Sequence, residues 1–165
     1  MREVGSRAPD FTLYDTSLKQ RALKEFLEKG HKTILAFFPG AFTSVCTTEL
    51  CAFRDLLGEL QKLNARLVAI SVDPPFSQRA FAEKYGFTFT LLSDFKREAI
   101  RKYDVVWKDL AGLQGYESAN RAVFILDGDG TIVYKWVAPN PGVLPDFEEI
   151  KRRLASDGKG ERGLA

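Results

Sequence analysis

Apolar runs alternate with amphipathic segments in the first two thirds of the chain, and this alternation limits the possible folds more than any other feature. The runs at 32–38, 66–72 and 89–92 are rich in β-branched, leucine and aromatic residues, as strands buried on both faces are. Between them, 44–64 and 75–85 carry apolar residues at intervals of three and four, which is typical of one-sided helices. A β-α-β-α-β order needs right-handed crossovers, so we predict a mainly parallel sheet covered by helices.

The last third of the chain predicts an antiparallel addition to this sheet. A helix is expected over 95–103 and an irregular stretch over 107–120, followed by strands at 122–126 and 131–137 with Asp-Gly-Asp-Gly between them. Asp-Gly pairs favour a hairpin because glycine adopts positive φ easily and aspartate tolerates it. A helix over 145–154, acidic at its start and basic at its end, closes the order. Parallel β-α-β followed by a hairpin and a helix predicts an α/β protein of thioredoxin-like fold with a central mixed sheet flanked by helices.

The length and composition of the chain indicate one domain. Of its 165 residues, 45% are apolar and 28% are charged, as in a globular protein with a single core. We expect this domain over 1–155, with a helix at 18–29 before the first buried strand. The polar, glycine-rich segment 156–165 is expected to be a flexible tail.

Charge and residue counts exclude several classes of function. The net charge of +2 comes from 24 basic and 22 acidic residues, which is too balanced for a nucleic-acid-binding surface. No apolar run is long enough to cross a membrane or to form a secretion signal, so we expect a cytoplasmic protein without a membrane partner. His31 is the single histidine and there are two cysteines, so neither a structural zinc site nor a disulfide framework is expected, and no cofactor is predicted.

Cys46 occupies a position that favours reactivity. It lies two or three residues inside the predicted helix if Thr43 or Ser44 is the N-cap. In an open α/β sheet this is the carboxyl edge of a strand, where ligands usually bind. The free N–H groups and the dipole of a helix N-terminus stabilise an anion, so we expect the pKa of Cys46 to fall below its ordinary value of about 8.5. From position alone, a nucleophile and a cysteine packed in the core are equally good interpretations.

The residues around Cys46 resemble a known active site. Pro39, Thr43 and Cys46 reproduce the motif P-x-x-x-T-x-x-C of the peroxiredoxin family at the correct spacing. Glu49 and Arg121 also match the family, and the resemblance extends from about residue 4 to the closing helix. The chain is therefore identified as a member of this family.

The resemblance implies a role for each of these residues. Cys46 would be the peroxidatic cysteine, whose thiolate attacks the O–O bond of hydrogen peroxide or an organic hydroperoxide and becomes a sulfenic acid. Thr43 would hydrogen-bond the thiolate and the peroxide, and the Arg121 guanidinium would stabilise the negative charge. The backbone N–H groups of Val45 and Cys46 would add to this stabilisation, while Pro39 would shield the site from water.

Two charged residues keep alternative interpretations. The resemblance implies that Glu49 orients Arg121, although an ordinary acidic residue in the first turns of a helix would also fit the sequence. Arg121 itself could be a solvated charge at the start of a strand.

Cys51 lies five positions after Cys46, which is similar to the peroxiredoxin Q, or bacterioferritin-comigratory, type. On an α-helix these two Cα atoms would be roughly 8.6 Å apart. A disulfide bridge requires about 7 Å or less, so bridging would need the helix to unwind. We hypothesise that Cys51 resolves the sulfenic acid as an intramolecular disulfide, which a thioredoxin- or glutaredoxin-like dithiol then reduces. The alternative is that Cys51 is a packed helix residue and that an outside thiol resolves Cys46.

Other functions of a thioredoxin-like fold fit the sequence less well. A disulfide oxidoreductase would use C-x-x-C, whereas four residues separate Cys46 from Cys51. A redox-inert interaction module or chaperone-like protein would not need Thr43, Cys46 and Arg121 together. The oligomeric state is left as monomer or homodimer.

Overall fold

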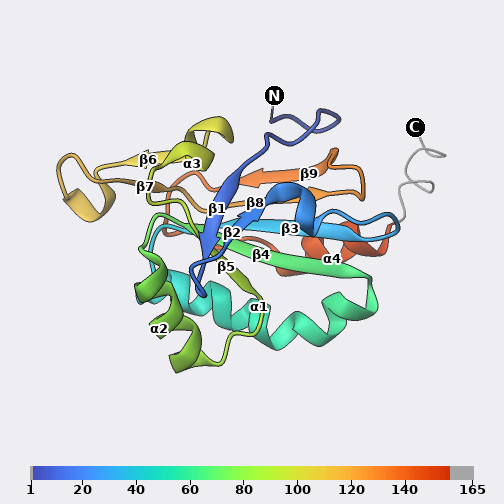
Figure 1. The fold of residues 1–165 in the computed structure, drawn as a ribbon, viewed down its shortest axis with the longest axis horizontal. Helices are drawn as coiled ribbons and strands as arrows, with labels where there is room; N and C mark the ends of the chain where they lie inside the picture. Colours follow the sequence, from blue (N-terminus) through green and yellow to red (C-terminus); the bar gives the residue numbers. More distant parts are fainter. Residues whose placement is uncertain (1, 157–165) are drawn as a thin grey trace.

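Seven strands form one mixed sheet in the order β2-β1-β5-β4-β3-β8-β9 (Figure 1). The structure is a computed structural model and describes residues 2–156. Strands β3, β4 and β5 run parallel, whereas β1, β8 and β9 are antiparallel to their neighbours β5, β3 and β8. The strands are β1 Thr12–Asp15, β2 Gln20–Ala22, β3 Lys32–Phe37, β4 Ala65–Ser71, β5 Thr90–Ser93, β8 Ala122–Leu126 and β9 Ile132–Val137. The predicted thioredoxin-like α/β arrangement is confirmed.

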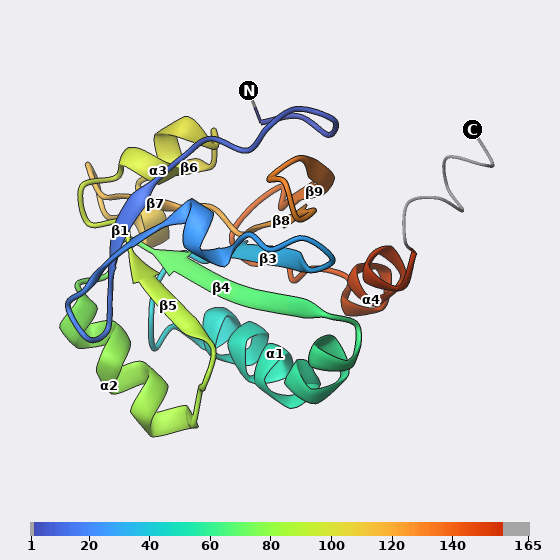
Figure 2. The same cartoon turned by 45° about the vertical axis from the view of Figure 1, so that its right-hand side comes forward.

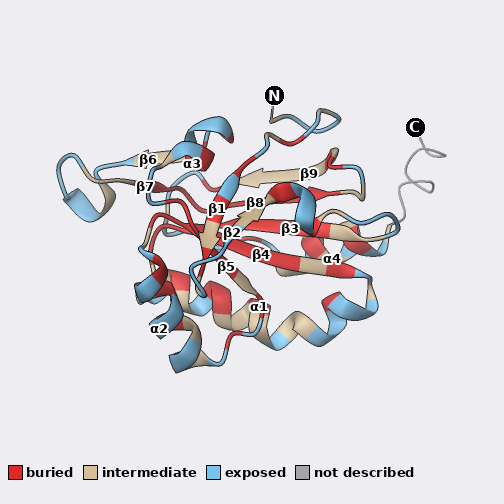
Figure 3. Ribbon diagram, in the orientation of Figure 1, coloured by how far each residue is buried: buried red, intermediate tan, exposed pale blue. Residues whose placement is uncertain are grey.

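The sheet separates two hydrophobic cores. In β3, Ile34 and Ala36 point to one core while Leu35 and Phe37 point to the other, and all four are fully buried. The first core lies under helices α1 Ser44–Lys62, α2 Pro75–Tyr85 and α4 Phe147–Ala155. The second is covered by the N-terminal segment, the 3-10 helix η1 Leu23–Phe26 and the short helix α3 Glu98–Lys102 (Figure 2). Figure 3 shows the resulting buried central strands and the exposed outer faces of the helices.

The predicted helix over 18–29 is wrong. The segment forms strand β2 and the 3-10 helix η1, and β2 pairs with β1, a strand that the sequence analysis did not identify. Leu18 occupies the turn between them with φ of 64° and is exposed, so it does not belong to an apolar helix face. The single turn of η1 places Leu23 and Phe26 against the sheet, where both are buried. Their spacing of three residues therefore resembles that of a longer helix.

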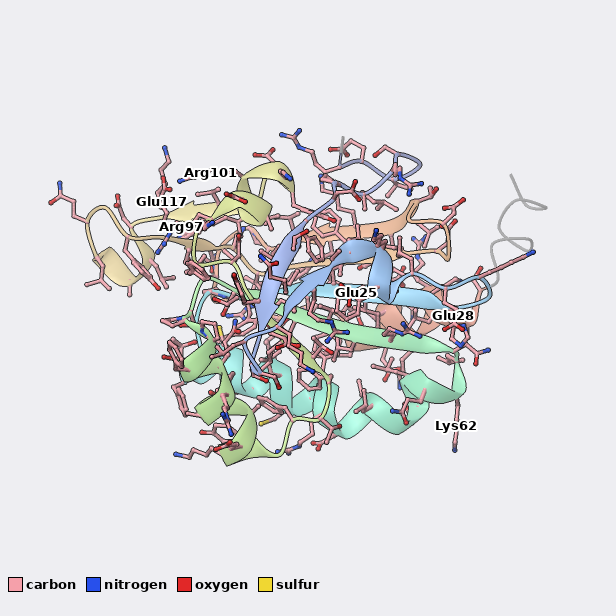
Figure 4. The ribbon with its side chains drawn as sticks, viewed as in Figure 1. Glu25, Glu28, Lys62, Arg97, Arg101 and Glu117 are labelled. Carbon is pink, nitrogen blue, oxygen red and sulfur yellow. The ribbon has the colours of Figure 1, made fainter. Side chains whose placement is uncertain are left out.

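The stretch predicted to be irregular, 107–120, forms a small two-stranded sheet that projects from the body of the protein (Figure 1). Its strands are β6 Val106–Lys108 and β7 Glu117–Ala119, with the 3-10 turn η2 Leu110–Gly112 between them. Arg97, Arg101 and Glu117 lie together at this two-stranded sheet (Figure 4). Arg101 Nη2 is 3.3 Å from Glu117 Oε1, and Arg97 Nε donates a hydrogen bond to the Glu117 carbonyl.

Helix α3 is shorter than the predicted segment 95–103. Arg97 precedes it in the left-handed conformation, with φ of 61°, so the helix begins only at Glu98. The Asp94 carboxylate accepts hydrogen bonds from the N–H groups of Ala99 and Ile100, and these bonds hold the first turn in place.

The predicted hairpin between β8 and β9 is confirmed, and its turn contacts a distant part of the chain. Asp127 Oδ1 accepts hydrogen bonds from the N–H groups of Asp129 and Thr131. At Gly128 an added Cβ would lie 2.6 Å from the carbonyl oxygen of Glu28, so only glycine fits against this backbone.

The C-terminal helix α4 begins two residues later than predicted. Asp146 is its N-cap and accepts from the N–H groups of Glu148 and Glu149, which carry the acidic charges of the first turn. The expected tail at 156–165 lies outside the described residues, except for Ser156. Within residues 2–156, no helix is long and apolar enough to cross a membrane.

Candidate active site

The loop after β3 places the start of α1 at the carboxyl edge of the sheet. The Phe38 N–H continues the parallel pairing by donating to the Ile70 carbonyl, and the chain then turns through 39–43 into the helix. Thr43 is the N-cap, in agreement with one of the two predicted positions, but its hydroxyl lies 2.8 Å from the Gly40 carbonyl and caps no helix N–H. The first N–H groups of α1, including those of Val45 and Cys46, therefore remain available to a ligand.

Arg121 connects the two acidic partners of the site. Its Nη2 lies 3.3 Å from Cys46 Sγ, and its Nη1 lies 2.7 Å from Glu49 Oε1. None of the three residues is more than 1% exposed, so the thiol, the guanidinium and the carboxylate share one buried environment. The structure thus brings together three residues that the sequence analysis selected, and the Glu49 contact fits the expected orienting role.

Two residues that the sequence analysis missed hold Arg121. The Pro141 carbonyl accepts from Arg121 Nε at 3.1 Å and from Nη2 at 2.7 Å. Asn120 accepts from the Arg121 N–H and donates its amide to the Ala138 carbonyl. A carbonyl acceptor has no sequence signal, although an asparagine directly before the arginine could have drawn attention to this junction.

The predicted lowering of the Cys46 pKa is wrong for this closed site. Burial raises the pKa of the Cys46 thiol above its ordinary value, while the Arg121 guanidinium, the Thr43 hydroxyl and the Gly40 N–H act in the opposite direction. Cys46 lies in the first turn of the helix, as predicted, but a thiol that is 1% exposed loses the hydration that would stabilise its anion.

Glu49 is also affected by its burial. Loss of hydration raises its pKa to about 7, although the adjacent Arg121 charge opposes this shift. Its second carboxylate oxygen, Oε2, is buried and has no hydrogen-bond partner among the described residues. Arg121 is therefore the one hydrogen-bond partner of the Glu49 carboxyl group among the described residues, and it alone opposes the effect of burial on the Glu49 pKa.

The remaining predicted residues lie around this centre. Pro39 is buried in the loop two residues after β3, Val45 is half-buried in the first turn of α1, and Cys51 is half-buried further along the same helix. Cys46 and Cys51 are both free thiols in a continuous helix, so they are not bridged in this conformation.

The first turns of α1 have few features that stabilise a helix. The hydroxyls of Thr47 and Thr48 bond back to the carbonyls of Thr43 and Ser44, a contact that slightly destabilises and bends helices. No acidic residue lies in the first turn, and the N-cap side chain makes no capping bond. The N-terminal part of α1 is therefore held mainly by the packing of its buried face.

Within residues 2–156, no three His, Cys, Asp or Glu side chains are grouped as metal ligands. A thioredoxin-like fold with a buried Cys–Arg pair at this helix start defines the class of thiol-dependent oxidoreductases. Residues 4–135 match the sequence profile of the AhpC/TSA family. The chain therefore belongs to this family, and the predicted membership of the peroxiredoxins, a class of peroxidases, is confirmed.

Named relatives agree with this assignment. The chain is 40% identical over 148 residues to alkyl hydroperoxide reductase E of Mycobacterium tuberculosis, covering 88% of this chain and 92% of the relative. It is 34% identical over 131 residues to peroxiredoxin Bcp of Escherichia coli, covering 79% and 82%. The crystal structure of peroxidoxin BcpB from Mycobacterium tuberculosis superposes with a TM-score of 0.80 at 30% identity, covering 93% of this chain and 97% of that one.

Proposed function

We propose that the chain reduces hydroperoxides through Cys46. The observation that carries this proposal is the distance of 3.3 Å between Cys46 Sγ and Arg121 Nη2, in a buried site at the N-terminus of α1. Hydrogen peroxide and organic hydroperoxides are the proposed substrates.

In the first step the Cys46 thiolate attacks one oxygen of the peroxide. The S–O bond forms as the O–O bond breaks, so sulfur is oxidised to the sulfenic acid and the leaving oxygen takes the electron pair and a proton to become water or an alcohol. Arg121 and the free N–H groups of α1 stabilise the charge that moves from sulfur to the leaving oxygen, and the Thr43 hydroxyl orients the peroxide. Glu49 keeps the guanidinium in place. Pro39 limits the access of water.

In the second step Cys51 resolves the sulfenic acid. Its thiolate displaces hydroxide from the Cys46 sulfur, which releases water after protonation and leaves a Cys46–Cys51 disulfide. The two cysteines cannot meet while α1 is intact, so its first turns must unwind. The hydrogen bonds from the Thr47 and Thr48 hydroxyls to the carbonyls of the preceding turn slightly destabilise the helix and therefore favour this unwinding. A thioredoxin- or glutaredoxin-like dithiol then returns both residues to thiols by exchange.

Mass spectrometry after one equivalent of hydrogen peroxide tests both cysteines. We expect the wild type to lose two hydrogens and to yield a linked Cys46–Cys51 peptide. Cys51→Ser should instead gain one oxygen at Cys46, and Cys46→Ser should consume no peroxide with dithiothreitol as reductant.

Two outcomes would contradict these assignments. Consumption of peroxide by Cys46→Ser at the wild-type rate would show that Cys46 is not the nucleophile. Full turnover of Cys51→Ser with dithiothreitol, without a linked peptide in the wild type, would remove the resolving role of Cys51. The cytoplasmic location and the choice between monomer and homodimer stay predictions.

A further inference from the structure

The turn between β3 and α1 contains a strained residue. Phe42 has φ of 66°, a left-handed conformation that is unfavourable for a bulky side chain. Its ring lies 5.0 Å from that of Phe81 and 6.4 Å from that of Tyr85, both on α2. Such a conformation persists only where the surroundings hold it, so contacts from outside the turn must determine its shape.

Asp73 supplies a contact of this kind. Its Oδ2 accepts a hydrogen bond of 2.8 Å from the N–H of Ala41, the residue directly before Phe42. A hydrogen bond to a charged carboxylate is stronger than one between neutral groups. The same turn leads directly into Thr43 and the first turn of α1, so Asp73 acts on the backbone that presents Cys46.

The Asp73 carboxylate is itself fixed by its neighbours. The Ser71 hydroxyl donates to Oδ2 at 2.6 Å, and Gln78 Nε2 donates to Ser71 Oγ at 2.9 Å and to the Leu92 carbonyl at 2.8 Å. Ser71 and Gln78 are fully buried. Two prolines, at positions 74 and 75, restrict the backbone immediately after Asp73. The carboxylate therefore has a defined direction toward the turn.

We propose that Asp73 is a positioning residue for the peroxidase reaction, which holds the Ala41–Phe42 turn in the closed shape that buries Cys46 for attack on peroxide. Release of this contact opens the site and favours the unwinding that brings Cys46 to Cys51. The kinetic part of this proposal rests on the proposed function, whereas the effect on the exposure of Cys46 does not.

The first test measures that exposure without any peroxide. In a Cys51→Ser background, the rate at which iodoacetamide alkylates Cys46 is followed as a function of pH, and the limiting rate at high pH reports access to the thiolate. We expect Asp73→Ala to raise this limiting rate roughly 10-fold. Asp73→Asn keeps an oxygen that can accept the Ala41 N–H, so it should restore much of the protection. Glu83→Ala, at an exposed position of α2, is the matched control and should change nothing.

The second test separates the two chemical steps by rapid mixing and acid quench in the chain with both cysteines. Asp73→Ala should slow the oxidation of Cys46 by hydrogen peroxide roughly 10- to 100-fold, since small misplacements of reacting groups cost this much. It should also accelerate disulfide formation. Ser71→Ala, which removes one support of the carboxylate, should move both rates in the same directions by smaller factors.

These measurements distinguish failure of the two proposals. An unchanged alkylation rate in a folded Asp73→Ala protein would overturn the positioning role, whatever the activity. An equal fall in both chemical rates would also overturn it, because a general loss of structure has that effect. If the wild type does not react with peroxide while Asp73→Ala exposes Cys46, the proposed function fails and the structural role of Asp73 stands.

Discussion

At the scale of single residues, one guanidinium serves two buried groups that both favour their neutral forms. Cys46 and Glu49 contact different nitrogens of Arg121, and burial raises the pKa of each. The sulfur becomes reactive only as the thiolate, so the positive charge of Arg121 must act against a cost that burial imposes. The ionisation of Cys46 therefore depends on how the positive charge of Arg121 is shared between Cys46 and Glu49.

Glu49→Gln tests the protonation of this carboxyl group. The pKa of Glu49 is about 7 in the folded protein, compared with 4.5 as its ordinary value, so between these values the folded state keeps a proton that the unfolded state has lost. The stabilising contribution is complete below 4.5 and is lost as the pH rises through the folded pKa. We expect the free energy of unfolding of the wild type, relative to Glu49→Gln, to fall over this range by at most about 1.4 kcal/mol per pH unit.

Denaturant titrations of both proteins at several pH values measure this difference. The subtraction removes the titration of groups that the two proteins share. A difference that is constant with pH, or one that grows as pH rises, would show that Glu49 is ionised throughout.

The family resemblance selected the candidate site residues but did not predict their environment. Thr43, Cys46, Glu49 and Arg121 could be selected as candidates because they match the peroxiredoxin family, whereas position alone left the role of Cys46 open. The direction of the Cys46 pKa shift could not, since it is set by how completely the surrounding side chains exclude water. The Pro141 carbonyl was also missed because any residue can supply a backbone acceptor.

At the scale of elements, helix α1 combines a weak beginning with a firmly packed middle. Leu50 and Phe53 are fully buried, whereas Thr47 and Thr48 bond to the carbonyls of the preceding turn. The unwinding proposed for disulfide formation thus involves a part of the helix that has no side-chain cap and two destabilising threonine hydrogen bonds. The remainder can stay in place on the sheet.

Thr48→Ala should slow disulfide formation without affecting the oxidation of Cys46. Thr48 is exposed, and alanine favours the helix by about 0.5 kcal/mol more than threonine, so the unwinding step should slow roughly twofold. Gly58→Ala is the control, because an added Cβ there meets no atom within 4 Å and stabilises the same helix beyond the region that unwinds. Acid-quench kinetics after a peroxide pulse give both rates. Slowing by Gly58→Ala as well would mean that the whole helix melts.

Long elements could be predicted from the sequence, whereas short ones depended on tertiary context. Between 32 and 92, the two helices were found because their apolar spacing repeats over several turns, and the three strands because each is a continuous apolar run. The segment 18–29 has apolar residues at helical spacing for only two turns, and pairing with β1 overrides that preference. Strands β6 and β7 have three residues each and no apolar alternation to reveal them.

At the scale of the whole molecule, Gly128 joins two parts of the chain that are far apart in sequence. The β8–β9 turn rests on the backbone of Glu28 and Lys29, where an added Cβ would lie 2.6 Å and 2.9 Å from main-chain atoms. Backbone cannot rotate away as a side chain can. We expect Gly128→Ala to lower the free energy of unfolding by about 1–3 kcal/mol, measured by urea denaturation.

The activity of Gly128→Ala provides the internal control. Residue 128 lies at the far end of β8 from Arg121, so the rate of Cys46 oxidation in the folded variant should equal that of the wild type. A stability equal to that of the wild type would show that the turn and the Glu28 segment are not in firm contact.

The division of the interior by the sheet has a consequence for repeated catalysis. Cys46 belongs to the core under α1, whereas the opposite core is built from the N-terminal segment, η1 and α3 and contains neither cysteine. The proposed redox cycle, which remodels the start of α1, would disturb packing on one side of the sheet only. The sheet, held from its opposite face by the second core, would keep the surface on which the helix re-forms, so each turnover would require local repair instead of refolding of the entire chain.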